Sequence, residues 1–182
     1  MKQLTPNFFA RDTIIVAKEL LGKIISFNGM SARIVETEAY KDDLASHAYK
    51  KTERSALMFD THANIYVYLI YGLYYCLNFT TEKNKPGAVL IRAVEPLTGI
   101  EEMKKRRKTG QIKNLCSGPG KLCIALGIDK TVNGIPVGKK IKILEDSYAV
   151  AKTISTSRIG IKDALHLKWR FYIARNEFVS KG

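Results

Sequence analysis

Short apolar runs separated by turn residues recur along this chain, a pattern typical of an antiparallel sheet with few helices. Strands are predicted at residues 23–27, 30–35, 65–70, 73–79, 88–94, 140–145 and 169–173. Asn28-Gly29 joins the first two runs, and this dipeptide favours a two-residue hairpin turn. Tyr71-Gly72 separates the next two runs and marks the turn of a second hairpin.

Helices are predicted at residues 12–21, 98–107 and 119–127. Asp12 is a good N-cap, and Pro119 suits a first helical turn. Thr98 and Glu101 have the spacing of a capping box. Residues 41–64 are polar and irregular, which predicts a long functional loop. The fold expected is one mixed α/β (α+β) domain over residues 1–182, with a mainly antiparallel sheet core flanked by helices and a protruding β-hairpin.

The charge of the chain favours a phosphate-bearing partner. Its 182 residues include 30 Lys and Arg against 17 Asp and Glu, a formal net charge of +13. Such an excess attracts nucleic acid or acidic membranes, although a generally basic proteome also produces it. The most apolar run, residues 65–79, is too short for a transmembrane helix, and the N-terminus lacks the apolar core of a signal peptide. We expect a cytoplasmic protein with no membrane segment.

Cysteine and histidine give no sign of a metal site. Three cysteines leave one unpaired in any disulfide scheme, and their spacing is not that of zinc ligands. They are Cys76, Cys116 and Cys123, and the three histidines lie elsewhere in the chain. We therefore expect reduced, mostly buried thiols and neither a metal nor another cofactor.

Aromatic residues gather in one place, because five of the nine tyrosines lie within residues 66–75. Combined with net positive charge, this cluster suits nucleic acid, which offers phosphates outside and flat bases inside. Tyr71-Gly72 at a hairpin tip would place a bulky group outward, like the side chains that some proteins insert between base steps. The alternative is a strand that passes through the core with a glycine bulge.

Glu36 and Glu38 are the candidates for acid–base chemistry. They lie at the end of a predicted strand, and a spacing of two places them on one face. A carboxylate entering a loop suits a general base, and the alternative is a pair of solvated edge glutamates. Asn78 and Arg92, near strand ends, are placed to converge on a pocket. Residues 104–108 are basic, either as a solvated helix face or as a phosphate-binding surface.

Several blocks of residues occur in an order that resembles the alkyladenine (3-methyladenine) DNA glycosylase family, in its bacterial form, over nearly the whole chain. The blocks are 17–22, 33–40, 46–47, 66–78, 90–96, 116–123, 158–160 and 169–172. Each block alone is modest evidence, whereas their joint order is specific. The resemblance implies a monofunctional enzyme that uses no metal, acts on double-stranded DNA containing alkylated purines and leaves an abasic site. We expect it to be a monomer that associates with the bacterial nucleoid.

The resemblance also implies roles for the catalytic residues. Glu38 matches the general base that activates the water attacking the sugar C1′. Arg92 and the carbonyl of Ile159 match the groups that help position this water.

The pocket residues follow from the same match. Tyr40, His47 and Tyr68 match the walls that sandwich the extruded base. Asn78 matches a residue that obstructs the exocyclic amino group of guanine. Tyr71 matches the side chain that fills the gap left in the duplex.

Residues 52–55 and 60–64 depart from the family pattern, which affects loop shape and, through it, lesion range and DNA affinity. Two other functions fit the composition. One is a non-catalytic nucleic-acid-binding protein that uses the tyrosines as a stacking platform. The other is a carbohydrate glycosidase with Glu36 and Glu38 as acid and base, although carboxylates on one face of a strand do not flank a sugar.

Overall fold

One long strand, β3, organises the molecule. The computed structural model describes residues 1–180. Its strands are β1 (Lys2–Gln3), β2 (Ile24–Phe27), β3 (Met30–Tyr40), β4 (Ile65–Ile70), β5 (Tyr74–Thr80), β6 (Ala88–Thr98), β7 (Lys142–Glu145), β8 (Thr153–Thr156) and β9 (Arg170–Ile173). Its α-helices are α1 (Pro6–Phe9), α2 (Thr13–Glu19), α3 (Ala56–Asp60), α4 (Ile100–Arg107) and α5 (Pro119–Leu126), and its short 3-10 helices are η1 (Ile112–Asn114) and η2 (Lys130–Val132).

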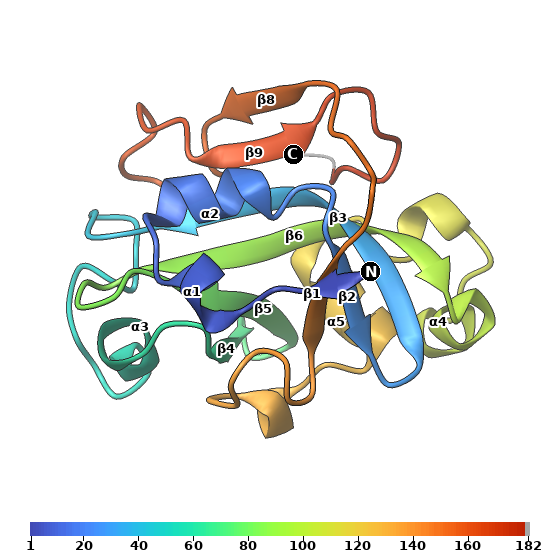
Figure 1. Cartoon of the computed structure of the whole chain (residues 1–182), viewed down its shortest axis with the longest axis horizontal. Helices are drawn as coiled ribbons and strands as arrows, with labels where there is room; N and C mark the ends of the chain where they lie inside the picture. The colour runs from blue at the N-terminus through green and yellow to red at the C-terminus, as the bar shows by residue number, and fades with distance from the viewer. Residues whose placement is uncertain (181–182) are drawn as a thin grey trace.

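The sheet forks at β3. One edge of β3 pairs with β6, while the other edge is shared by β2, opposite residues 30–33, and by β9, opposite residues 36–38. The main order is β1-β7-β2-β3-β6-β5-β4, and β9 leads on to β8. In Figure 1 the β8–β9 hairpin lies apart from β2, on the far side of α2. The result is a curled antiparallel sheet in a mixed α/β domain, as predicted.

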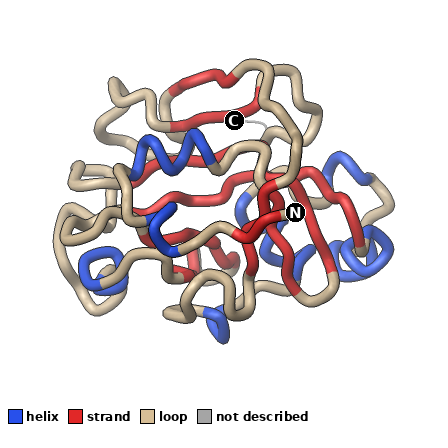
Figure 2. Tube along the Cα trace, viewed as in Figure 1, coloured by secondary structure: helices blue, strands red, loops and turns tan. Residues whose placement is uncertain are grey.

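Helices cover the sheet and close the core. In Figure 1, α2 lies in front of β3 and above β6, and α5 lies behind the sheet, where it packs against β5 and β6. Residues 88–94 of β6 are buried without interruption, because cover on both faces removes the alternation of a half-exposed strand. Phe9 of α1 meets Phe79 of β5 edge-on in this core, at 5.8 Å between ring centroids. Figure 2 shows how much of the remaining chain is loop.

The local turn and cap signals are confirmed. Asn28 and Gly29 both have positive φ, as a tight hairpin turn requires, and Phe27 pairs with Met30 across it. Asp12 caps α2 as predicted. Pro119 opens α5 in its first turn.

Two strands continue well past their predicted ends. β3 continues to Tyr40, so Glu36 and Glu38 lie inside the strand and not at its end. β6 continues to Thr98, whose hydroxyl lies 2.8 Å from that of Ser31, and Gly99 takes the N-cap position of α4. The predicted capping box is therefore wrong, because strand pairing holds its first residue.

Residues 41–64 are not wholly irregular, since they contain α3. Of the two unusual stretches, residues 52–55 form a turn in which Ser55 Oγ accepts from the Thr52 amide at 2.9 Å. In residues 60–64, the Thr61 hydroxyl donates to the carbonyl of Leu57 at 2.7 Å. The first stretch therefore forms the turn before α3, and the second is hydrogen-bonded to the end of α3.

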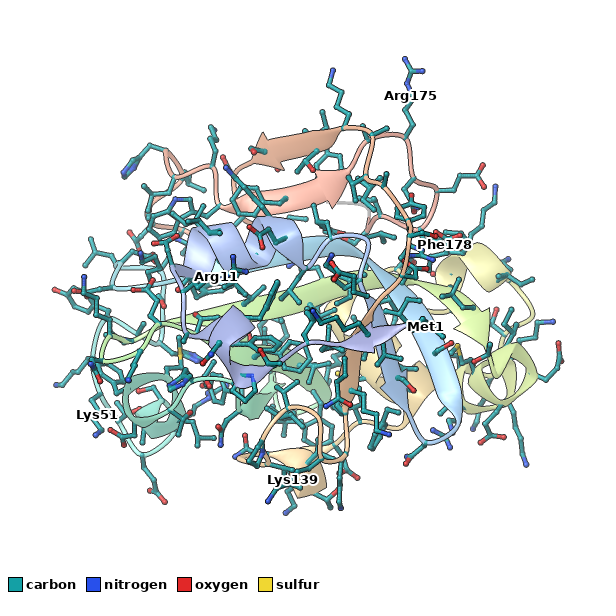
Figure 3. All side chains as sticks on the ribbon, in the orientation of Figure 1. Met1, Arg11, Lys51, Lys139, Arg175 and Phe178 are labelled. Carbon is teal, nitrogen blue, oxygen red and sulfur yellow. The ribbon has the colours of Figure 1, made fainter. Side chains whose placement is uncertain are left out.

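Two broader expectations can be compared with the described chain. All three cysteines are buried and unbridged, as predicted. Within residues 1–180, no helix has both the length and the apolar character needed to cross a membrane. Basic side chains reach outward on different sides of the molecule, as the labelled Lys51, Lys139 and Arg175 show in Figure 3.

The cap of α2 gives a stability prediction. One oxygen of Asp12 accepts from the amides of Ile14 and Ile15 at 2.9 and 3.1 Å, and the other pairs with Lys41 at 2.6 Å. Asp12→Ala removes both contacts and is expected to lower the free energy of unfolding in urea by about 1–2 kcal/mol. Asp12→Asn keeps the cap and loses only the partly exposed ion pair, so it should lose about 0.5 kcal/mol. Equal losses in the two variants would contradict the capping explanation.

Candidate active site

A row of side chains crosses four neighbouring strands beside a cavity. Glu38 of β3 is opposite Leu90 of β6, and Leu90 is opposite Asn78 of β5. Asn78 is in turn opposite Tyr66 of β4. Directly opposed residues in antiparallel strands share a face, so these side chains project to the same side of the sheet. A cavity of about 720 Å³ lies there, and its lining includes Tyr40, His47, Tyr68, Tyr71, Asn78, Arg92 and Ile159.

Arg92 reaches this site because β6 is irregular at that point. The ladder between β3 and β6 matches Glu36 with Ala93 and Thr37 with Ile91, which leaves Arg92 as an extra residue in β6. Such a bulge re-aims a side chain, and bulges are common next to active sites. Here it directs the guanidinium between two carboxylates: Arg92 Nε lies 3.2 Å from Glu36 Oε1, and Nη1 lies 3.3 Å from Glu38 Oε2.

The carboxylate of Glu38 is fully buried and has a contact on each oxygen. Oε1 accepts from the backbone amide of Ile159 at 2.7 Å. Oε2 accepts from the Tyr40 hydroxyl at 2.9 Å and from Arg92. Three separate chain segments therefore meet on this one group: β3, β6 and the loop that follows β8.

Burial raises the pKa of Glu38, and this effect outweighs the opposing effects of Arg92, of the Ile159 amide and of the Tyr40 hydroxyl. The nearby charge of Glu36 raises it further. A raised pKa makes Glu38 a stronger base than an exposed carboxylate when it is ionised.

Glu38 lies just outside the cavity, behind residues that line it. Its own side chain is not part of the cavity lining, but Tyr40, Arg92 and Ile159, which contact its two oxygens, all are. The carboxylate thus lies one layer of atoms behind the wall. Ile159 makes its contact through the amide N–H, whereas the role predicted from sequence involved its carbonyl.

The predicted aromatic walls are brought together. His47 and Tyr68 meet edge to face, with ring centroids 4.9 Å apart and an angle of 67° between planes. His47 Nδ1 lies 3.1 Å from the hydroxyl of Tyr66. Tyr66 in turn lies beside Tyr68, at 5.4 Å between centroids. A flat ligand in the cavity would therefore meet a continuous set of rings.

Arg158, which the sequence interpretation used only as part of a motif, holds Tyr40 in place. Its guanidinium lies 4.7 Å from the Tyr40 ring centroid and donates to both oxygens of Asp43, at 2.6 and 3.0 Å. It also donates to the carbonyl of Ala39 at 3.2 Å. Because Ile159 follows directly in the chain, one buried side chain fixes both the wall of the cavity and the amide donor to Glu38. Its position next to Ile159 was the only sequence signal.

Arg54 is a second cation that the sequence interpretation did not place at the site. Its guanidinium lies 4.9 Å from the Tyr68 ring centroid and donates to the carbonyl of Leu69 at 2.8 Å. Burial lowers the pKa of His47, and the positive charge of Arg54 lowers it further. His47 is therefore neutral near pH 7.

Asn78 is buried at the sheet end of the cavity. Its side-chain nitrogen donates to the backbone carbonyls of Tyr66 and Cys76, at 3.1 and 3.2 Å. One bond crosses to β4 and the other stays within β5, and together they fix the amide in one orientation. A fixed polar group of this kind can accept or reject a ligand edge by its hydrogen bonding.

The tip of the β4–β5 hairpin is exposed and strained. Tyr71 is 80% exposed and Leu73 is 73% exposed, so the alternative of a strand crossing the core is wrong here. Tyr71 and Gly72 have φ of 53° and 67°, and the Leu73 amide closes the turn on the carbonyl of Ile70 at 3.1 Å. A tyrosine in the left-handed region is uncommon and costs about 1 kcal/mol or more. Strain of this kind, at an apolar tip next to a cavity, points to a functional constraint.

The structure also decides the interpretation of Glu36 and of the basic residues on α4. Glu36 is fully buried, so the alternative of two solvated edge glutamates is wrong. On α4, Lys104 and Arg106 pair with Glu101 and Glu102 of the same helix, as a solvated helix face does. Across the described residues, no group of three or more Asp, Glu, His and Cys side chains is placed to hold a metal ion.

Comparison with known proteins agrees with the resemblance seen in the sequence. The model of the family described as methylpurine-DNA glycosylase matches residues 7–177. Three bacterial proteins with the provisional name 3-methyladenine DNA glycosylase are similar over nearly the whole chain. They are from Clostridium perfringens strain 13 (46% identity, 98% of this chain and 99% of the relative), Alkaliphilus oremlandii (44%, 98% and 99%) and Rhizobium johnstonii (45%, 96% and 88%).

The environment of His47 gives a pH prediction. We expect an NMR titration of the imidazole protons to show His47 with a pKa below its ordinary value of 6.5. Arg54→Gln removes the nearby positive charge, so the pKa of His47 should rise in that variant. Because the unfolded chain binds this proton at higher pH than the folded protein does, the contribution of His47 to stability falls as the pH drops below its ordinary pKa. The signal is assigned by its loss in His47→Gln. An unchanged midpoint in Arg54→Gln would contradict this explanation.

Proposed function

The chain belongs to the methylpurine-DNA glycosylase family, and we propose that it flips an alkylated purine out of duplex DNA and hydrolyses its N-glycosidic bond with water, leaving an abasic site. As a DNA-3-methyladenine glycosylase it is an enzyme of DNA repair. The observation that carries the mechanism is a buried carboxylate, Glu38, whose hydrogen-bonding partners line an aromatic cavity. The proposal treats the whole chain as one glycosylase domain.

Base flipping is the first requirement, because C1′ of a stacked nucleotide cannot be reached inside a duplex. Extrusion costs a few kcal/mol, and less where the lesion already weakens pairing. Tyr71 is exposed on a hydrogen-bonded turn that also borders the cavity. In our proposal its ring enters the space that the extruded base leaves, which offsets part of the unstacking cost. The net positive charge of the chain supplies phosphate contacts.

The cavity then holds the base between Tyr40 on one side and His47 with Tyr68 on the other. Alkylation at N3 or N7 gives a purine a delocalised positive charge, and tyrosine rings attract cations by about 0.5–2 kcal/mol each. The neutral state of His47 avoids placing another charge against that base. Asn78, fixed by its two backbone contacts, obstructs the exocyclic amino group of guanine and so disfavours a normal base.

Glu38 performs the chemical step in this proposal. It accepts a proton from water as the water oxygen bonds to C1′, the C1′–N bond breaks, and its electron pair neutralises the departing purine. A water molecule reaches the carboxylate by replacing one present donor, the Ile159 amide or the Tyr40 hydroxyl. This exchange costs little, because one hydrogen bond replaces another. Arg92 and the carbonyl of Ile159 then position the water, and the charge of Arg92 favours the ionised form of Glu38 against the effect of burial.

The two other functions considered differ in what they release. A non-catalytic protein that stacks bases on tyrosine would bind single strands and release no base. A carbohydrate glycosidase would leave DNA intact. Release of free 3-methyladenine from methylated duplex DNA therefore separates all three.

Glu38→Gln tests the general base. The glutamine keeps the size of the side chain but cannot take a proton, so excision of 3-methyladenine under single-turnover conditions should fall by a factor of about 10²–10⁴. Binding to lesion-containing duplex should persist. Glu102→Gln, on the exposed face of α4, is the matched control. A near-normal excision rate in Glu38→Gln would refute the assignment.

Tyr71→Ala tests the inserted side chain. The cavity stays intact in this variant, but extrusion loses its support, so lesion-specific affinity should fall by a factor of about 10 or more while binding to undamaged duplex changes little. Tyr148→Ala removes an exposed tyrosine far along the chain and serves as the control. The measurement is fluorescence anisotropy on matched lesion and undamaged duplexes. Wild-type affinity and excision in Tyr71→Ala would show that the tip does not insert.

A further inference from the structure

Behind Glu38 lies a second buried carboxylate with its own set of partners. Glu36 is fully buried, and its Oε1 lies 2.6 Å from Arg170 Nε and 3.2 Å from Arg92 Nε. The Ser180 amide donates to Glu36 Oε2 at 2.7 Å, and the Ser180 hydroxyl donates to Oε1 at 2.9 Å. Glu36 does not line the cavity, so it cannot touch a substrate there.

Glu36 and Glu38 compete for one guanidinium. Arg92 lies almost equally far from both carboxylates, at 3.2 and 3.3 Å, and it is the only ion-pair partner of Glu38 within residues 1–180. Arg170 changes this competition, because it approaches Glu36 more closely than Arg92 does. The four groups together carry two negative and two positive charges, and a balanced set avoids the high cost of an unpaired buried charge.

The geometry points to Glu36 and Arg170 as a positioning pair that sets the proton affinity of Glu38 through Arg92. Arg170 compensates the charge of Glu36, and this leaves Arg92 free to stabilise ionised Glu38. The fork in the sheet makes the pairing of Arg170 with Glu36 possible. β9 pairs with β3 so that Arg170 lies opposite Glu38, and from there its guanidinium reaches Glu36. This inference rests on the proposed function for its kinetic consequence, but its electrostatic part concerns the free protein.

The arrangement of Arg170 supports a fixed role. Its guanidinium lies 4.9 Å from the ring centroid of Tyr172, and Nη2 donates to the carbonyl of Ser180 at 3.3 Å. Ser180 therefore contacts both members of the pair. The titratable and charged groups that face Glu38 come from five strands: Glu36 and Tyr40 of β3, Tyr68 of β4, Cys76 of β5, Arg92 of β6, and Arg170 of β9 through Glu36.

Charge balance predicts opposite effects for the two members. Arg170→Gln leaves one guanidinium for two carboxylates, so the pKa of Glu38 should rise by about one unit. Glu36→Gln removes the competing negative charge, so the pKa of Glu38 should fall. The double variant restores the balance and should return close to wild type. Arg170→Lys keeps the positive charge and should rescue Arg170→Gln.

The test combines two measurements on the full chain. Carboxyl ¹³C NMR follows the titration of Glu38 in the free protein, assigned by its loss in Glu38→Gln. Single-turnover excision of 3-methyladenine, with enzyme in excess, gives the midpoint of the acidic limb of the rate against pH. Shifts in opposite directions in both measurements support the pair.

Other outcomes are equally decisive. Loss of rate by one factor at every pH, with no shift of either midpoint, would show a merely structural role and overturn the inference. If Arg170→Gln fails to fold, Glu36→Gln alone decides, by a downward shift or its absence. Opposite NMR shifts in a protein that excises no base would support the pair and refute the proposed function, so the two failures are distinguishable.

Discussion

The buried charge of Glu38 is the constraint on which the rest of the site depends. A carboxylate removed from water is tolerated only when charge and hydrogen bonds replace its hydration, and breaking such a pair costs about 3–5 kcal/mol. Here the replacements come from a bulge in β6, a hydroxyl two residues along β3 and an amide far along the chain. The local geometry of three segments is therefore tied to one functional group.

The sequence predicts most of the fold, because its strongest signals are local. The Asn28-Gly29 turn, the Asp12 cap and the Pro119 helix start each depend on neighbouring residues, and each is confirmed. The prediction fails where tertiary pairing overrides a local signal. Thr98 has the pattern of a helix cap, but a longer β6 pairs it with Ser31 of β3. The extension of β3 to Tyr40 depends in the same way on β6 and β9, which arrive from elsewhere in the chain.

The residues of the candidate site likewise divide into those that the sequence predicts and those that depend on tertiary contacts. Residue types and motif order are enough to name Glu38, Tyr40, Tyr68 and Asn78. The structure places Glu38 and Asn78 in one row across the sheet, and it places Tyr40, Tyr68 and Asn78 around one cavity. The supporting residues were not predicted, because their contacts span large separations in sequence. Arg158 reaches Asp43, and Arg170 reaches Glu36, only after the sheet has folded. No periodicity or spacing in the chain encodes such pairs.

Two arginines that lie against the aromatic walls of the cavity bear on how a glycosylase would discriminate between bases. Arg158 lies against the ring of Tyr40 and Arg54 against that of Tyr68, at 4.7 and 4.9 Å. A ring that already attracts one cation offers less attraction to a second, so the two walls favour a charged base less than free rings would. Binding then depends more on shape and on the ease of extrusion. An alkylated purine is then favoured less in binding than in the breaking of the C1′–N bond, because the departing base loses its positive charge in that step. Only interactions that are stronger in the transition state than in the bound state increase the rate of that step.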